Sequence, residues 1–75
     1  MTPTQTYRTI QVGRIVGQEF TGKTARRRAL RVMAEMDGAG MLHEITETVE
    51  GPEIYTTLWK DGAIDVAATQ EWQSI

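Results

Sequence analysis

The residues with the clearest chemical potential form an eight-residue motif in the first third of the chain. The segment Gly17-Gln18-Glu19-Phe20-Thr21-Gly22-Lys23-Thr24 matches the pattern GxxxxGK[ST] and precedes a run of helix-forming residues. In a phosphate-binding loop, backbone N–H groups at the start of a helix hold phosphate oxygens. Lys23 would then neutralise phosphate charge and Thr24 would offer its hydroxyl to Mg²⁺.

The rest of the chain argues against a nucleotide hydrolase. Such a fold needs several parallel strands joined by helical crossovers, and only 39 residues follow Met36. Those residues have the pattern of antiparallel hairpins. We therefore interpret the motif as a strand-to-helix connection that happens to match the pattern.

A second chemical feature is the separation of charge along the chain. Residues 1–40 carry seven basic and three acidic groups, a net charge of +4, whereas residues 41–75 carry one basic and seven acidic groups, a net charge of −6. Five of the eight cations lie within nine residues: Lys23, Arg26, Arg27, Arg28 and Arg31. We predict that they form a contact surface for a partner, because arginine is enriched at interface hot spots and pairs bidentately with carboxylates. The alternative is a solvated helix face, partly neutralised by the pair Arg31 and Glu35.

The acidic half supplies the other candidate contacts. Glu44 and Glu47 are predicted to face a cationic surface of a partner, where they would compete with nucleic acid. Tyr55 and Trp59 are predicted to be interface anchors, because a chain this small cannot bury all its aromatic residues.

Other classes of site lack the residues they require. The chain has one histidine, His43, and no cysteine, so we predict no metal site and no cofactor. No nucleophile stands in a recognisable catalytic setting, and we predict that the protein is not an enzyme. No apolar run reaches the roughly 20 residues of a membrane helix, and Met1 to Ile10 has no signal-peptide core. We expect no membrane partner and a cytoplasmic location.

The elements that position these residues follow from hydrophobic periodicity. With 75 residues, 40% of them apolar, we predict one domain over residues 1–75, with residues 1–5 frayed. Residues 6–20 are rich in strand formers and predict one long strand, bulged or bent at a glycine. Thr24 is the predicted N-cap of a helix over residues 25–36, which has an apolar side at Ala25, Ala29, Val32, Met33 and Met36.

The second half predicts an antiparallel meander. Alternation over residues 41–49 and 54–59 predicts two strands separated by a turn at Gly51-Pro52. Asp61-Gly62 predicts a tight hairpin that leads into a strand over residues 63–68. Residues 69–75 fit a further strand or a helical turn, and we favour a strand. The fold class is therefore α+β: an antiparallel sheet of four strands, with a candidate fifth, packed against one amphipathic helix in the order β-α-β-β-β.

In size, acidity, lack of cysteine and charge pattern, the chain resembles small inhibitor proteins encoded by phages and mobile elements, anti-CRISPR proteins in particular. The resemblance covers the whole chain and rests on its size and charge pattern, not on particular residues such as Arg26-Arg27-Arg28 or Glu44-Ile45-Thr46-Glu47, and no catalytic residue is carried over. It implies stoichiometric binding to a host nucleoprotein effector and obstruction of its nucleic-acid entry. We predict a non-enzymatic protein-binding module, either such an inhibitor or an adaptor. The alternative is a small nucleic-acid-binding domain that uses the arginine-rich helix as a phosphate clamp.

Overall fold

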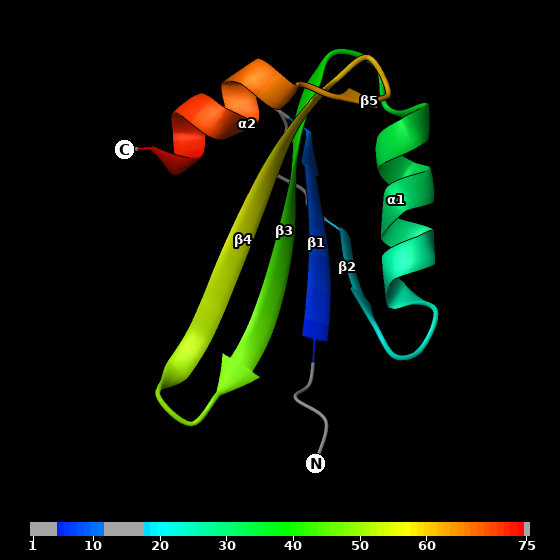
Figure 1. Cartoon of the computed structure of the whole chain (residues 1–75). Coiled ribbons are helices and arrows are strands. Elements are labelled where there is room, and N and C mark those ends of the chain that lie inside the picture. Colours follow the sequence, from blue (N-terminus) through cyan, green and yellow to red (C-terminus); the bar gives the residue numbers. More distant parts are fainter. Residues whose placement is uncertain (1–4, 12–17, 75) are drawn as a thin grey trace.

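The computed structural model describes residues 5–11 and 18–74, which form one antiparallel sheet and two helices (Figure 1). The strands are β1 (Gln5–Gln11), β2 (Gln18–Thr21), β3 (Ala39–Thr48), β4 (Gly51–Lys60) and β5 (Ala63–Ile64). The helices are α1 (Ala25–Glu35) and α2 (Val66–Gln73). In space the strand order is β2-β1-β3-β4-β5. The α+β class predicted from the sequence is confirmed.

The register of β3 with its neighbours divides the sheet into two faces. On the first face, Leu42 and Glu44 of β3 lie opposite Thr57 and Tyr55 of β4. On the second face, His43 lies between Arg8 of β1 and Thr56 of β4. The alternation predicted for these two strands is therefore confirmed.

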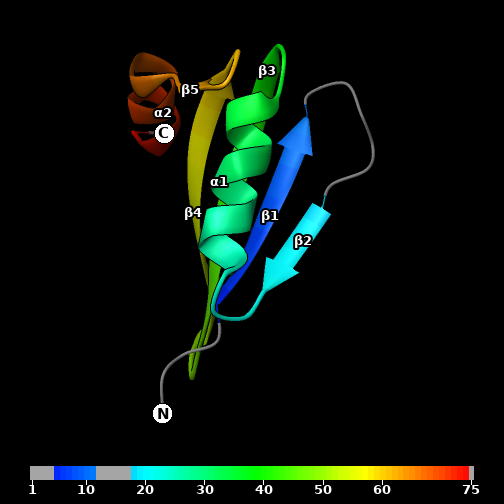
Figure 2. The ribbon, with the colours of Figure 1, turned by 90° about the vertical axis from the view of Figure 1, so that its right-hand side faces the viewer.

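Helix α1 packs on the first face, in front of the sheet in Figure 2. Its residues Ala25, Ala29 and Met33 are completely buried, and they form the core with Tyr7 and Leu42. These three helical residues belong to the predicted apolar side, because positions four apart lie on the same helix face. The helix ends one residue before the predicted limit, with Met36 as its C-cap.

Gly40 allows the C-terminal end of α1 to approach the sheet closely. A Cβ atom at Gly40 would overlap Met36 Sδ and would lie 3.0 Å from the Ile10 carbonyl oxygen. It would also lie 3.2 Å from Met33 Cε. The methionine side chains therefore fill the space left by the missing Cβ, and this contact fixes the helix over β3.

The predicted long strand over residues 6–20 is wrong. β1 and β2 are separate strands that pair with each other antiparallel, with Tyr7 opposite Phe20. The alternation of strand-forming residues does not distinguish one long strand from the two strands of a hairpin. The predicted bend at a glycine, Gly13 or Gly17, lies outside the described residues, and so does the predicted fraying of residues 1–4; Gln5 is already part of β1.

The turn between β3 and β4 is also displaced from its prediction. Thr48 pairs with Gly51, so Val49 and Glu50 form the turn, while Gly51 and Pro52 begin β4. Proline is tolerated there because that end of β4 lies at the edge of the sheet, where no strand needs its N–H. At the next hairpin, Asp61 and Gly62 have φ values of 51° and 83°, and both positive values fit the predicted tight turn.

The C-terminal prediction is wrong, because the chain forms a helix where a strand was favoured. β5 contains only Ala63 and Ile64, and α2 follows directly. Asp65 is its N-cap: Asp65 Oδ1 accepts a hydrogen bond of 3.0 Å from the Ala68 N–H. The element order is thus β-β-α-β-β-β-α, and the fifth strand arises from the division of the first predicted strand, not from the C-terminal tail.

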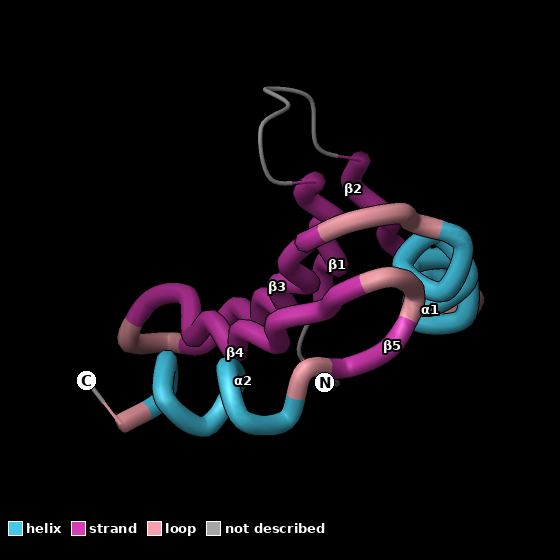
Figure 3. The backbone as a smooth tube through the Cα atoms, turned by 90° about the horizontal axis from the view of Figure 1, so that it is seen from above, coloured by secondary structure: helices cyan, strands magenta, loops and turns pink. Residues whose placement is uncertain are grey.

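Helix α2 covers the edge of β4, as the view along the strands shows (Figure 3). Thr69 Oγ1 accepts a hydrogen bond of 3.0 Å from the Leu58 N–H and donates one of 3.3 Å to the Leu58 carbonyl oxygen. Gln73 Nε2 donates to the Thr56 carbonyl oxygen at 3.5 Å. The two side chains thus take the place of a neighbouring strand along part of this edge.

Candidate functional site

The five clustered cations do not form one surface. The side chains of Lys23, Arg27 and Arg31 are exposed, and the two arginines lie on the side of α1 that faces away from the sheet. Arg28 is engaged locally: its Nη2 donates to the Thr21 carbonyl oxygen at 2.9 Å, and its guanidinium lies 5.3 Å from the centre of the Phe20 ring.

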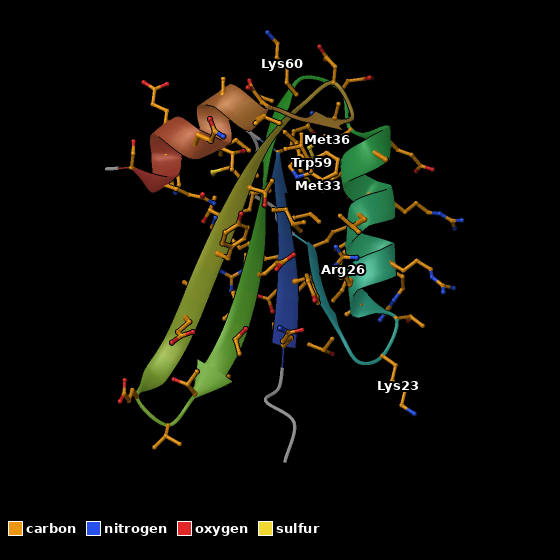
Figure 4. The ribbon with its side chains drawn as sticks, in the orientation of Figure 1. Lys23, Arg26, Met33, Met36, Trp59 and Lys60 are labelled. Carbon is orange, nitrogen blue, oxygen red and sulfur yellow. The ribbon has the colours of Figure 1, made fainter. Side chains whose placement is uncertain are left out.

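Arg26 belongs to a different part of the molecule, because it points toward the sheet from the N-terminal end of α1 (Figure 4). There it lines a groove of about 420 Å³ on the first sheet face, between the two helices. The floor of the groove is formed by β3 and β4, and its walls by α1 on one side and β5 with α2 on the other. Its lining residues are Arg26, Leu30, Leu42, Glu44, Tyr55, Thr57, Trp59, Ile64, Val66, Thr69, Gln70 and Gln73.

Strand alternation explains why the aromatic residues meet in this groove. Tyr55, Thr57 and Trp59 occupy every second position of β4, so their side chains share one face. Glu44 lies directly across from Tyr55 on the same face. Four of the residues predicted to contact a partner, Arg26, Glu44, Tyr55 and Trp59, are therefore brought together.

Trp59 connects the groove with the core. Its ring packs against the core cluster near Met33 and Met36, as Figure 4 shows. Its Nε1 atom is buried and has no hydrogen-bond partner in the described part of the chain. The indole is consequently held by packing alone.

A second hollow of about 390 Å³ adjoins the groove at the N-terminal end of α1. It is lined by Lys23, Thr24, Arg26, Arg27 and Leu30, so the two hollows share Arg26 and Leu30. Within residues 5–11 and 18–74, no carboxylate lies within ion-pair distance of Lys23, Arg26 or Arg27. An apolar groove is thus continuous with a surface of unpaired positive charge.

The two predicted acidic contacts are separated by the sheet. Glu44 lies in the groove, whereas Glu47 lies on the second face, near the turn between β3 and β4. Around this turn the side chains of Glu47, Glu50 and Glu53 are exposed. Val49, in the turn itself, has an exposure of 106% and is therefore fully open to solvent.

Among the described residues, the second face carries one ion pair and the histidine. Arg8 and Glu19 form a salt bridge between β1 and β2. Burial, and secondly the charge of Arg8, lower the pKa of His43 below its ordinary value. No group of three metal-ligating residues occurs in the described ranges.

The GxxxxGK[ST] motif does not adopt a phosphate-binding loop where it is described. Gln18 to Thr21 form β2 and pair with β1, so their backbone is extended. Thr24 occupies the predicted N-cap position of α1, but its side chain makes no capping hydrogen bond. Gly17 lies outside the described residues.

Sequence reasoning missed one whole wall of the groove. Ile64 and Val66, and the polar residues Thr69, Gln70 and Gln73, were not expected at a site because their segment was assigned to strands. The available signal was Asp65 followed by Val66-Ala67-Ala68, an N-cap residue before a short run containing two good helix formers.

Comparison of the chain with protein-family models, with curated proteins and with solved structures finds no match. Neither helix among the described residues has the length and apolar character needed to cross a bilayer.

Proposed function

We propose that the protein is a non-enzymatic protein-binding module that holds a segment of its partner in the groove between α1 and α2. The observation that carries this proposal is the exposure of apolar side chains around the groove. Tyr55, Ile64 and Val66 are 53%, 49% and 61% exposed, although each lines the same hollow. Apolar side chains gathered in this way on a small domain are typical of interaction sites.

The groove also has the composition of an interface. Tyr55 and Trp59 line it, Arg26 belongs to one wall, and Thr57 and Gln70 add polar side chains. Aromatic and arginine side chains dominate binding energy when they are desolvated by a partner. Because the floor is a paired sheet, little ordering of the backbone would be needed on binding.

For the partner itself, we propose a protein of a nucleic-acid-handling complex that this chain inhibits, in the manner of anti-CRISPR proteins. The support is the separation of charge: exposed cations on α1, and glutamates at the β3–β4 turn. The acidic turn would compete with phosphates for a cationic surface, while the groove would supply affinity.

A nucleic-acid-binding function is the second candidate, and the exposure of Lys23, Arg27 and Arg31 favours it. In that case binding should weaken steeply with salt, because phosphate contacts release counterions. Arg27→Glu combined with Arg31→Glu should abolish a gel shift of duplex DNA or RNA at low salt. A gel shift that persists in this double variant would exclude the clamp on α1.

The groove is tested by two matched variants of neighbouring residues on opposite faces of β4. Tyr55 lines the groove, whereas Ile54, with a similar exposure of 58%, faces the other side. Proteins captured from an extract of the cells that make the chain would be purified, and their affinity for each variant would be measured by calorimetry.

We expect Tyr55→Ser to weaken binding about tenfold or more, a loss typical of an interface aromatic. Ile54→Ser should change the affinity less than about twofold, because an exposed residue outside the interface contributes little. Equal losses in the two variants, or no loss with Tyr55→Ser, would contradict the proposal.

A further inference from the structure

The turn between β3 and β4 is an acidic projection. Within the described residues, β1 pairs with β3 as far as Thr46, whereas β3 and β4 pair as far as Thr48 and Gly51. The hairpin extends past the described part of β1, as its lower end in Figure 1 shows. We call residues 47–53 the hairpin tip: it presents the fully exposed Val49 and the exposed side chains of Glu47, Glu50 and Glu53, with Glu47 and Glu53 on opposite faces of the hairpin.

The hairpin tip has the chemistry that the two adjoining hollows lack. The groove offers apolar contacts around Leu30 and Trp59, and the hollow beside it offers Lys23, Arg26 and Arg27. A ligand that fits both hollows needs an apolar side chain with carboxylates close to it. Charge complementarity of this kind directs an encounter and fixes its orientation.

We propose that the hairpin tip of one copy docks into the groove of a second copy, with Val49 toward Leu30 and the glutamates toward the cations of α1. This inference rests on the proposed function of the groove as a binding site. Glu44 on the groove floor repels the glutamates of the tip, so it favours docking against the α1 wall.

A tip cannot reach the groove of its own chain. Tyr55, Thr57 and Trp59 of the groove floor belong to the same β4 strand as Pro52 and Glu53 of the tip. A paired strand cannot fold back on itself, so the groove can only receive the tip of another molecule. The contact joins two different surfaces, and such head-to-tail contacts continue from copy to copy unless a ring closes.

Self-docking would regulate the proposed function. A copy whose groove holds a neighbouring tip cannot hold a partner there, so the partner must compete with self-association. Free grooves would then predominate in dilute protein, and occupied grooves in concentrated protein.

The test is the mass of the purified chain in solution, measured by sedimentation equilibrium from about 10 µM to about 1 mM, where weak contacts become populated. We expect the mean mass to rise above the 8.4 kDa of one copy. Glu47→Lys/Glu50→Lys reverses the net charge of the hairpin tip, and Arg26→Glu/Arg27→Glu reverses the net charge of the hollow beside the groove. Either pair should weaken association about tenfold or more, and an equimolar mixture of the two variants should restore it.

Glu35→Lys/Glu71→Lys is the matched control for the tip variant, because it makes the same change in net charge at exposed sites outside the groove. This control should change the association less than about twofold. Val49→Ser should weaken it without affecting folding, because Val49 is fully open to solvent.

Three results would overturn the inference: a parent protein that keeps a mass of 8.4 kDa throughout, a control that loses as much association as the tip variant, or a mixture that fails to restore it. The first result would leave the groove free for another protein, which the comparison of Tyr55→Ser with Ile54→Ser tests separately.

Discussion

Among the single residues, Trp59 contributes both to the core and to the groove. One part of its ring belongs to the core with Met33 and Met36, and another part forms the floor of the groove. The binding surface is therefore continuous with the most tightly packed part of the molecule. Changes that loosen the core should also alter the groove, whereas changes on the outer side of α1 should not.

Met33 tests this core most simply, because it is completely buried. Met33→Asp should lower the free energy of unfolding by about 2–5 kcal/mol, since it places an unpaired carboxylate in the core. Urea denaturation would measure the loss. Ala34→Asp, one residue further and exposed, adds the same charge and should cost less than about 1 kcal/mol. Equal stability of the two variants would mean that α1 is turned differently.

His43 supplies a prediction about pH. Its pKa lies below 6.5 in the folded protein, mainly because burial disfavours the imidazolium and secondly because Arg8 repels it. The unfolded chain therefore binds more protons just below pH 6.5. The stability that His43 contributes is complete above that pH, and it is lost as the pH falls toward the lower folded value.

Arg8→Gln should raise the pKa of His43 part of the way toward its ordinary value, because burial persists. His43→Gln should remove this histidine's share of the pH dependence of stability between about pH 5 and 7. NMR titration of the His43 ring and urea denaturation at several pH values would measure the two effects. A pKa unchanged by Arg8→Gln would exclude the charge of Arg8 as a cause.

Among the helices and strands, the sequence correctly predicts those that depend on residues close together in the chain. The apolar spacing of α1, the alternation of β3 and β4, and Asp61-Gly62 each determine a structure from a few neighbouring residues. The strand over residues 6–20 was predicted wrongly, because its division into β1 and β2 depends on pairing between distant residues. α2 was missed because its single buried residue, Thr69, is polar and gives no apolar stripe.

α2 is held to the sheet largely by hydrogen bonds to the edge of β4, which makes Thr69 its critical residue. Thr69→Val keeps the shape of the side chain but leaves the Leu58 N–H without its partner, at a cost of about 1–3 kcal/mol. We expect faster hydrogen exchange at the Leu58 amide and partial loss of helix by circular dichroism. Thr69→Ser keeps the hydroxyl and should resemble the parent. Equal exchange rates in all three proteins would show that Thr69 does not hold α2.

At the scale of the whole molecule, the site depends on elements that only the complete fold brings together. Tyr55 and Trp59 could be predicted as anchors from the sequence, and Arg26 from its cluster. Their meeting with Val66 could not, because it requires both α1 and α2 beside β4. The arginine residues of residues 26–31 form one cluster in the sequence. In the structure they lie in three places: the groove, the edge beside Phe20 and the outer side of α1.

The most direct test of the groove as the binding site is a nitrogen-15 NMR titration of the labelled protein with its purified binding protein. We predict that the signals of the Trp59 indole N–H and of the Thr57 and Val66 amides shift most, because these residues line the groove. The amide of Arg31, which lies on the outer side of α1 and lines neither hollow, should shift little. A large shift at Arg31 with an unchanged Trp59 indole signal would contradict this prediction and would place the interface on the outer, basic side of α1.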